Sequence, residues 1–227
     1  MEPFVIVFAL YPNITQLDFT GPLEVVRRAP NVRWIAASGS GGELTADSGL
    51  VFGGLEKLSS IERCDLICVP GGQGQAAAVM DSDFVAEVRR LGQTARYVTS
   101  VCTGSLILAA AGLLQGKRAA CHWAWREMLA EAGAIPDPGR VVRDGNVISG
   151  GGVTAGIDFA LSLVAELWSP EVAQAIQLSI EYDPAPPFDA GRPEKAPPAV
   201  LEIVCERIAR VYPERKAAMQ AALARGI

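Results

Sequence analysis

The chain has 227 residues, 50% of them hydrophobic, and a formal net charge of −5. This length and apolar content predict a globular protein with a sizeable core, and no apolar run is long enough to span a membrane. The acidic balance argues against nucleic acid as a partner, because a phosphate-binding surface needs clustered lysine and arginine. Five cysteines without a framework spacing and a single histidine argue against disulfides and a zinc site. With no signal-peptide pattern at the start, we expect a cytoplasmic protein.

The first part of the chain predicts buried strands alternating with helices. Three runs have the length of strands: residues 4–10, a continuous apolar run expected to be covered on both faces, then residues 32–37, and the buried run at residues 65–69. After the first run, a loop from Asn13 to Asp18 precedes a helix expected from Gly21 to Arg28. Asp18 is therefore expected beyond the carboxyl end of the first strand.

The third run ends in a glycine-rich turn at residues 70–74. Gly72, Gly74 and Ala77 match the spacing of a dinucleotide fingerprint. That fingerprint also needs an acidic residue at the end of the next strand to hold the ribose, and the strand expected at 97–101 offers none. We therefore expect no nucleotide cofactor. The glycine amides either face a small polarised group or form a plain tight turn.

The strongest functional signal is the stretch from Tyr97 to Ser105. Residues 97–101 predict a buried strand, and a helix begins almost at once after it, so Cys102 must lie in the turn. Such a turn strains the backbone and lifts the side chain above the sheet edge. The first amides of the helix favour a thiolate, and we expect Cys102 to be oxidised before the other four cysteines. The alternative, an inert core cysteine, stays open.

Two later segments are candidates for the walls of a pocket around Cys102. His122, beside Trp123, is either a pocket residue or a core group that burial keeps neutral. A hairpin at 141–149 leads into the glycine-rich run 150–156 and a helix at 157–167. These glycines either wall the pocket or only let helix and sheet touch.

The C-terminal part is expected to lack a core of its own. A helix at 170–182 is followed by a proline-rich stretch at 183–198, which predicts an ordered wrap or linker. Two helical segments split by Pro213 then complete the chain. We therefore expect one domain over residues 1–227, with 183–227 as a proline-rich wrap and C-terminal helical extension.

The alternation of strands and helices predicts an α/β sandwich with a mostly parallel sheet and a nucleophile elbow. In such sheets the site lies past the carboxyl ends of the strands. Asp18, Gly72, Cys102 and His122 are all expected at that edge, and this convergence from separate segments indicates an active site.

These residues also resemble the DJ-1/PfpI superfamily. The resemblance rests on residues 101–105, 112–119 and 122–123, and segments 17–22 and 150–158 are similar to the isocyanide hydratase branch. The likeness continues through residues 181–188. It implies a flavodoxin-like, glutamine amidotransferase-like three-layer sandwich that forms a homodimer. It also implies that water is added to an isocyanide substrate, giving an N-formamide, without metal or cofactor.

By position, the resemblance implies Cys102 as the nucleophile and Asp18 as the acid/base. It implies Thr103 as the hydroxyl that steadies the thiolate. Four further residues are expected to form the substrate or oxyanion pocket: Gly72, His122, Gly152 and Val153.

Two alternative functions stay open. A DJ-1-like redox sensor or glyoxalase-type protein would use the same cysteine with a glutamate neighbour. The ligand-sensing domains of AraC-type regulators carry similar elbow and His-Trp residues. The protease-like branch has histidine directly after the cysteine, where this chain has Thr103, which argues against a peptidase.

Overall fold

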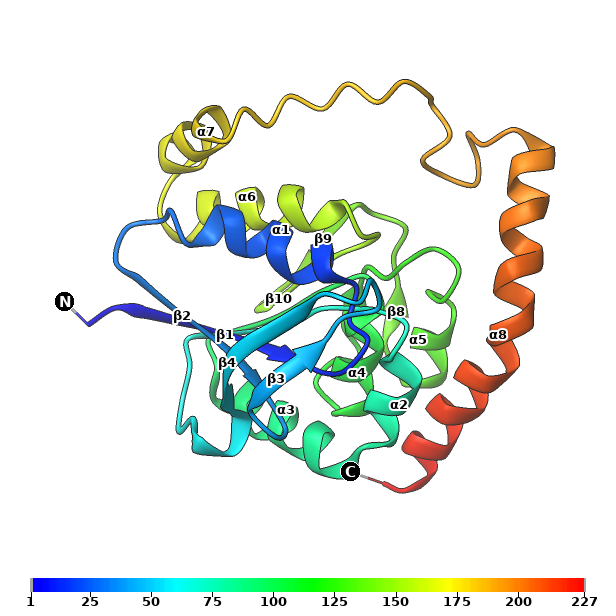
Figure 1. Cartoon of the computed structure of the whole chain (residues 1–227), viewed down its shortest axis with the longest axis horizontal. Helices are drawn as coiled ribbons and strands as arrows, with labels where there is room; N and C mark the ends of the chain where they lie inside the picture. Colours follow the sequence, from blue (N-terminus) through cyan, green and yellow to red (C-terminus); the bar gives the residue numbers. More distant parts are fainter. Residues whose placement is uncertain (1, 227) are drawn as a thin grey trace.

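The computed structural model describes residues 2–226 and is built on an eight-stranded sheet (Figure 1). The strand order is β3-β4-β2-β1-β5-β6-β10-β9. Within this order, every neighbouring pair between β4 and β10 is parallel. Two antiparallel pairs, β3 with β4 and β9 with β10, form the edges. The strands are β1 Phe4–Leu10, β2 Val32–Ser38, β3 Gly42–Thr45, β4 Val51–Lys57, β5 Leu66–Val69, β6 Tyr97–Val101, β9 Val141–Asp144 and β10 Val147–Gly150. This sheet confirms the predicted mostly parallel α/β architecture.

Helices cover both faces of the sheet, which gives three layers (Figure 1). One outer layer holds α1 Gln16–Val26, α6 Ala155–Leu167 and α7 Pro170–Ser179. The other holds α2 Gln75–Met80, α3 Ser82–Thr94, α4 Gly104–Ala110, α5 Met128–Glu131 and α8 Pro198–Ala224. Two short strands, β7 Arg118–Ala119 and β8 Ile135–Pro136, pair separately, and a 3₁₀ turn, η1, spans Leu58–Ser60.

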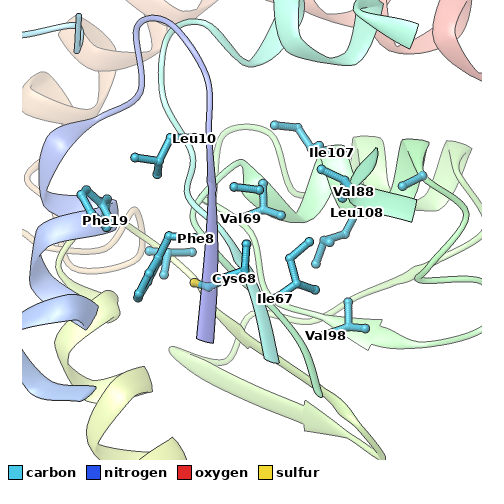
Figure 2. Packing of buried hydrophobic residues seen from close by; sticks show 14 of the residues in the cluster. Phe8, Leu10, Phe19, Ile67, Cys68, Val69, Val88, Val98, Ile107 and Leu108 are labelled. Atoms are coloured by element: carbon cyan, nitrogen blue, oxygen red, sulfur yellow. The ribbon is translucent and has the colours of Figure 1, made fainter. Parts of the chain in front are cut away.

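The core lies on both sides of the central strands, because successive side chains of a strand point to opposite faces. Figure 2 shows Phe8 of β1 against Phe19 of α1, whose ring centroids are 5.1 Å apart. On the other face Ile67 of β5 lies toward Ile107 and Leu108 of α4 (Figure 2). All of these side chains are buried. Apolar runs without alternation therefore fit strands that are covered on both faces.

Helix α1 begins earlier than the sequence indicated. It starts at Gln16, not at Gly21, and Pro22 lies inside it. Proline is well tolerated in the first turn of a helix, where a backbone N–H has no helical partner, so Pro22 indicated a start near Gly21. In the structure Pro22 lies further along α1, and it makes no helical hydrogen bond to the Asp18 carbonyl. Asp18 consequently lies in the first turn of a helix and not in a loop.

The C-terminal extension also differs from expectation. Residues 198–224 form one helix, α8, with Pro213 inside it, where two segments were expected. Packing holds this helix together: α8 contacts α2, α4 and α5, and Met219 and Ala222 are buried there. Residues 184–190 contain no helix or strand, and Figure 1 shows them in a long connection between α7 and α8. Helix α7 ends at Ser179, before the expected Tyr182.

Across residues 2–226, none of the helices combines the length and the apolar character that crossing a membrane requires.

Candidate active site

Cys102 lies in the turn between β6 and α4, as predicted, with a φ of 58°. A left-handed conformation costs a residue with a side chain roughly 1–2 kcal/mol. The turn is fixed by two hydrogen bonds: the Cys102 N–H donates to the Gly150 carbonyl at 2.9 Å, and Ser105 Oγ donates to the Cys102 carbonyl at 3.1 Å. Strain that is held this firmly is typical of functional positions.

Asp18 lies fully buried beside this turn. Its Oδ2 accepts a hydrogen bond from the Gly71 N–H at 3.0 Å, while Oδ1 has no partner among residues 2–226. Burial is the main cause that raises the pKa of Asp18 to about 7, against the lowering effects of the Gly71 amide and of Cys102. The carboxyl group can therefore gain or lose a proton near neutral pH.

Thr103 connects the elbow to the turn after β5. Its Oγ1 accepts a hydrogen bond from the Gly72 N–H at 3.1 Å. That amide is therefore occupied and is not free to stabilise an oxyanion. The backbone N–H of Thr103 lowers the pKa of the Cys102 thiol.

Gly71 is a site residue that the sequence did not single out. A Cβ atom on Gly71 would lie 2.5 Å from the Thr103 nitrogen and 2.8 Å from Asp18 Oδ2. Only a residue without a side chain lets the β5–α2 turn contact both of the proposed catalytic groups.

The charge state of Cys102 differs from the expectation of an activated thiolate. Cys102 is 5% exposed, and burial, followed by the negative charge of Asp18, raises its pKa well above the ordinary value. Desolvation thus exceeds the effect of the short helix α4, and the resting group is a thiol. Four of the five cysteines are buried and Cys205 is exposed. Exposure therefore does not favour early oxidation of Cys102.

A cavity of about 170 Å³ opens at the elbow. Its walls come from widely separated segments: Thr15, Asp47, Gly72, Gln73, Cys102, Thr103, His122, Trp125, Val153 and Arg215. The structure thus brings Gly72, His122 and Val153 to the cavity with Cys102 and Thr103. Gly152 is not among the lining residues, and Asp18 lies behind the wall, next to Cys102.

His122 is a wall residue held in its neutral form. Burial lowers its pKa, and the charge of Arg215 acts in the same direction. Its Nδ1 accepts a hydrogen bond from the Ala124 N–H at 3.3 Å, and its ring stacks on Trp123 at 5.7 Å. Both interpretations of His122 therefore hold. The residue lines the cavity, and it is also a largely buried group whose ring is hydrogen-bonded.

Two further residues at the site carried no sequence signal. Tyr11 is buried, and its hydroxyl donates to the Pro70 carbonyl at 3.0 Å. Arg215 reaches the cavity from α8, far along the chain from the elbow. No local pattern links that helix to Cys102, so only the three-dimensional structure identifies Arg215.

Within residues 2–226, no cluster of three or more histidine, cysteine, aspartate or glutamate side chains is placed to hold a metal ion.

Comparison with known proteins places this geometry in context. The model of the DJ-1/PfpI family matches residues 5–166. The isonitrile hydratase of Pseudomonas putida is 49% identical over 205 residues, which cover 89% of each chain. A crystal structure of a ThiJ/PfpI family protein from Pseudomonas syringae superposes with a TM-score of 0.93 at 40% identity, covering 96% of this chain and 91% of that one. The transcriptional regulator CdhR of Pseudomonas aeruginosa is 31% identical over 77% of this chain and 53% of its own length.

Proposed function

The chain belongs to the DJ-1/PfpI family, and from its 49% identity to an isonitrile hydratase we propose that it hydrates isocyanides to N-formamides, with Cys102 as the nucleophile. One observation carries the chemistry. A strained, buried thiol at Cys102 is paired with a buried carboxyl group at Asp18 whose pKa is about 7. A nucleophile and a proton-transfer group thus meet beside a small cavity.

The first half of the reaction forms a thioimidate. The Asp18 carboxylate accepts the thiol proton while the Cys102 sulfur attacks the terminal carbon of R–N≡C. Asp18 then gives the proton to the same carbon, so that a C–S and a C–H bond form there. The product is R–N=CH–S–Cys102, and no electron donor or acceptor is needed.

The second half consumes water. Asp18 takes a proton from water while the water oxygen attacks the thioimidate carbon, and that proton then goes to the nitrogen. The C–S bond of the resulting R–NH–CH(OH)–S–Cys102 then breaks, and the hydroxyl proton returns to sulfur. N-formamide leaves, and Cys102 is again a thiol.

The cavity limits the substrate. Its volume of about 170 Å³ is below the roughly 300–1,000 Å³ of pockets that enclose drug-sized ligands. We expect it to enclose the isocyanide group and a small substituent, while a larger substituent extends outside.

The hydratase is favoured over the alternatives. Redox-sensor cysteines have a low pKa and are accessible, whereas Cys102 is buried and its pKa is raised. A glyoxalase-type site is expected to hold a glutamate, and the buried acid here is Asp18. The likeness to the regulator CdhR covers about half of that protein's length.

We further propose that the protein is a cytoplasmic homodimer. Its five cysteines are all free, as in a reducing compartment. Leu178 of α7, Phe188 of the segment after it and Ile203 of α8 are 82%, 79% and 52% exposed, and contact with a second copy would bury such side chains. Light scattering of the purified protein should give twice the mass of one chain. A mass equal to one chain at micromolar concentration would overturn the dimer.

The function is tested by incubating the purified protein with isocyanides of increasing size and measuring N-formamide by NMR. Small isocyanides should be converted fastest. Glyoxal serves as the comparison substrate. Glyoxal consumption without N-formamide from any isocyanide would contradict the hydratase and favour the glyoxalase-type alternative.

A further inference from the structure

Helix α8 places a cation in the wall of the Cys102 cavity. The Arg215 guanidinium lies 4.4 Å from the ring centroid of Trp125, and Arg215 Nη2 donates to the Gln73 carbonyl at 3.3 Å. Trp125 stacks in turn on Tyr212 of the same helix, with centroids 5.7 Å apart and planes at 13°. The charge is therefore held on one side by a backbone carbonyl and on the other by an aromatic face.

The groups that face Cys102 make this cation significant. Asp18 of α1 raises the pKa of the thiol by its negative charge, and Cys121 does so when ionised. The charge of Cys102 raises the pKa of Tyr11, which follows β1, and the charge of Arg215 lowers it. Asp47 lines the same cavity.

The remaining charged and titratable groups near the elbow do not supply a cation to the cavity. His122 is neutral, and the charge of Arg126 lowers the pKa of Cys121. Among the lining residues that the structure describes, Arg215 is the only permanent cation.

Thiolate formation in this setting needs a compensating positive charge. Burial and Asp18 both disfavour negative charge on the sulfur, yet the attack on carbon requires electron density there. A guanidinium remains protonated even when partly buried, and its attraction for a thiolate increases as water is excluded. Arg215 and Cys102 line the same cavity, so a thiolate that forms there lies in the field of the guanidinium. Burial lowers the pKa of Arg215, and the charges of Tyr11 and Cys102 oppose that effect.

We propose that Arg215 is a positioning residue of the C-terminal extension that stabilises the Cys102 thiolate as it forms. This role rests on the proposed function, in which Cys102 is the nucleophile. Arg215 lies outside residues 5–166, where the family model matches. The cation therefore comes from helix α8, outside the part of the chain that the family model matches.

The test measures alkylation of Cys102 by iodoacetamide, a neutral reagent that a cationic side chain does not attract. All variants carry Cys205→Ser to remove the exposed thiol, and the modified peptide is quantified by mass spectrometry between pH 7 and 9.5. Arg215→Gln and Arg215→Met should both react about tenfold more slowly at each pH, as expected when an opposite charge that shifts a pKa by about one unit is lost. Arg215→Lys should restore most of the rate, because it keeps the charge.

Arg225→Gln is the matched control. Arg225 lies on the same extension and donates to the Met80 carbonyl at 3.0 Å, away from the cavity. In Arg225→Gln, Cys102 should be alkylated at the same rate as in the unsubstituted protein. Thermal melts should show that each variant is folded. Equal alkylation rates for folded Arg215→Met and the unsubstituted protein would overturn the proposal. Equal slowing in Arg215→Lys or Arg225→Gln would also overturn it, since the effect would then be structural.

This experiment is independent of the hydratase assay. If alkylation slows in Arg215→Met while no isocyanide is converted, the role of Arg215 stands and the proposed function fails. In an active enzyme, Arg215→Met should lower kcat more than it raises KM, because the charge acts on the attacking sulfur and not on substrate binding.

Discussion

At the residue scale, the site depends on two buried groups that both resist ionisation. The pKa values of Cys102 and Asp18 are both raised, chiefly by burial. A buried carboxylate costs stability, and the Asp18 Oδ1 atom has no partner among residues 2–226 to offset that cost. We infer that this pair is retained for chemistry, because an apolar or amide side chain would serve the fold better.

Asp18→Asn should separate function from stability. Asparagine keeps the shape but cannot transfer a proton, so turnover should fall by about 10²-fold or more. The raised pKa means that the folded protein binds this proton more tightly than the unfolded chain does. Stability from this group is complete below pH 4 and is lost as the pH rises through 7. Raising the pKa from 3.8 to about 7 corresponds to roughly 4 kcal/mol.

Asp18→Asn should therefore melt at a higher temperature than the unsubstituted protein at pH 8, and the difference should shrink toward pH 4. Calorimetry at both pH values, with turnover at pH 8, checks both effects. Unchanged turnover would refute the proton-transfer role, and a melting difference independent of pH would refute the buried ionisation.

At the scale of elements, the β5–α2 turn must approach both the elbow and α1. Gly71→Ala should cost at least tenfold in turnover, because its Cβ would displace Thr103 or Asp18. Gly152→Ala is the matched control, since a Cβ at that position meets no atom within 4 Å. Kinetic constants of the two folded variants decide the matter. Comparable losses in both would show that contact by the turn is not the cause.

The elements that sequence predicted well are those set by local patterns. The elbow follows from a strand, a turn and a helix in immediate succession, and the β9–β10 hairpin from its Asp-Gly turn. The start of α1 was wrong because Pro22 is a strong local signal that tertiary packing overrides. The thiolate expectation was wrong because burial is a property of the whole fold, and a short helix cannot reveal it.

At the scale of the whole molecule, α8 connects the C-terminal extension to the cavity. We propose that the chain is one domain in which α8 unfolds together with the sheet. Trp125, one of four tryptophans, stacks on Tyr212 across this contact, so the Trp125 contribution to the fluorescence reports on it. Urea unfolding followed by fluorescence and by circular dichroism should give one coincident transition. An earlier fluorescence transition would show that α8 detaches first and would contradict a single domain.

The most direct test of the account is N-formamide production by Cys102→Ala and Cys102→Ser beside the unsubstituted protein. The unsubstituted protein should convert a small isocyanide. The alanine variant should be folded, by circular dichroism, and inactive, because no group remains to attack carbon. The serine variant should be almost as poor, since a hydroxyl is far less ionised than a thiol. N-formamide formation at the unsubstituted rate by folded Cys102→Ala would show that this sulfur is not the nucleophile.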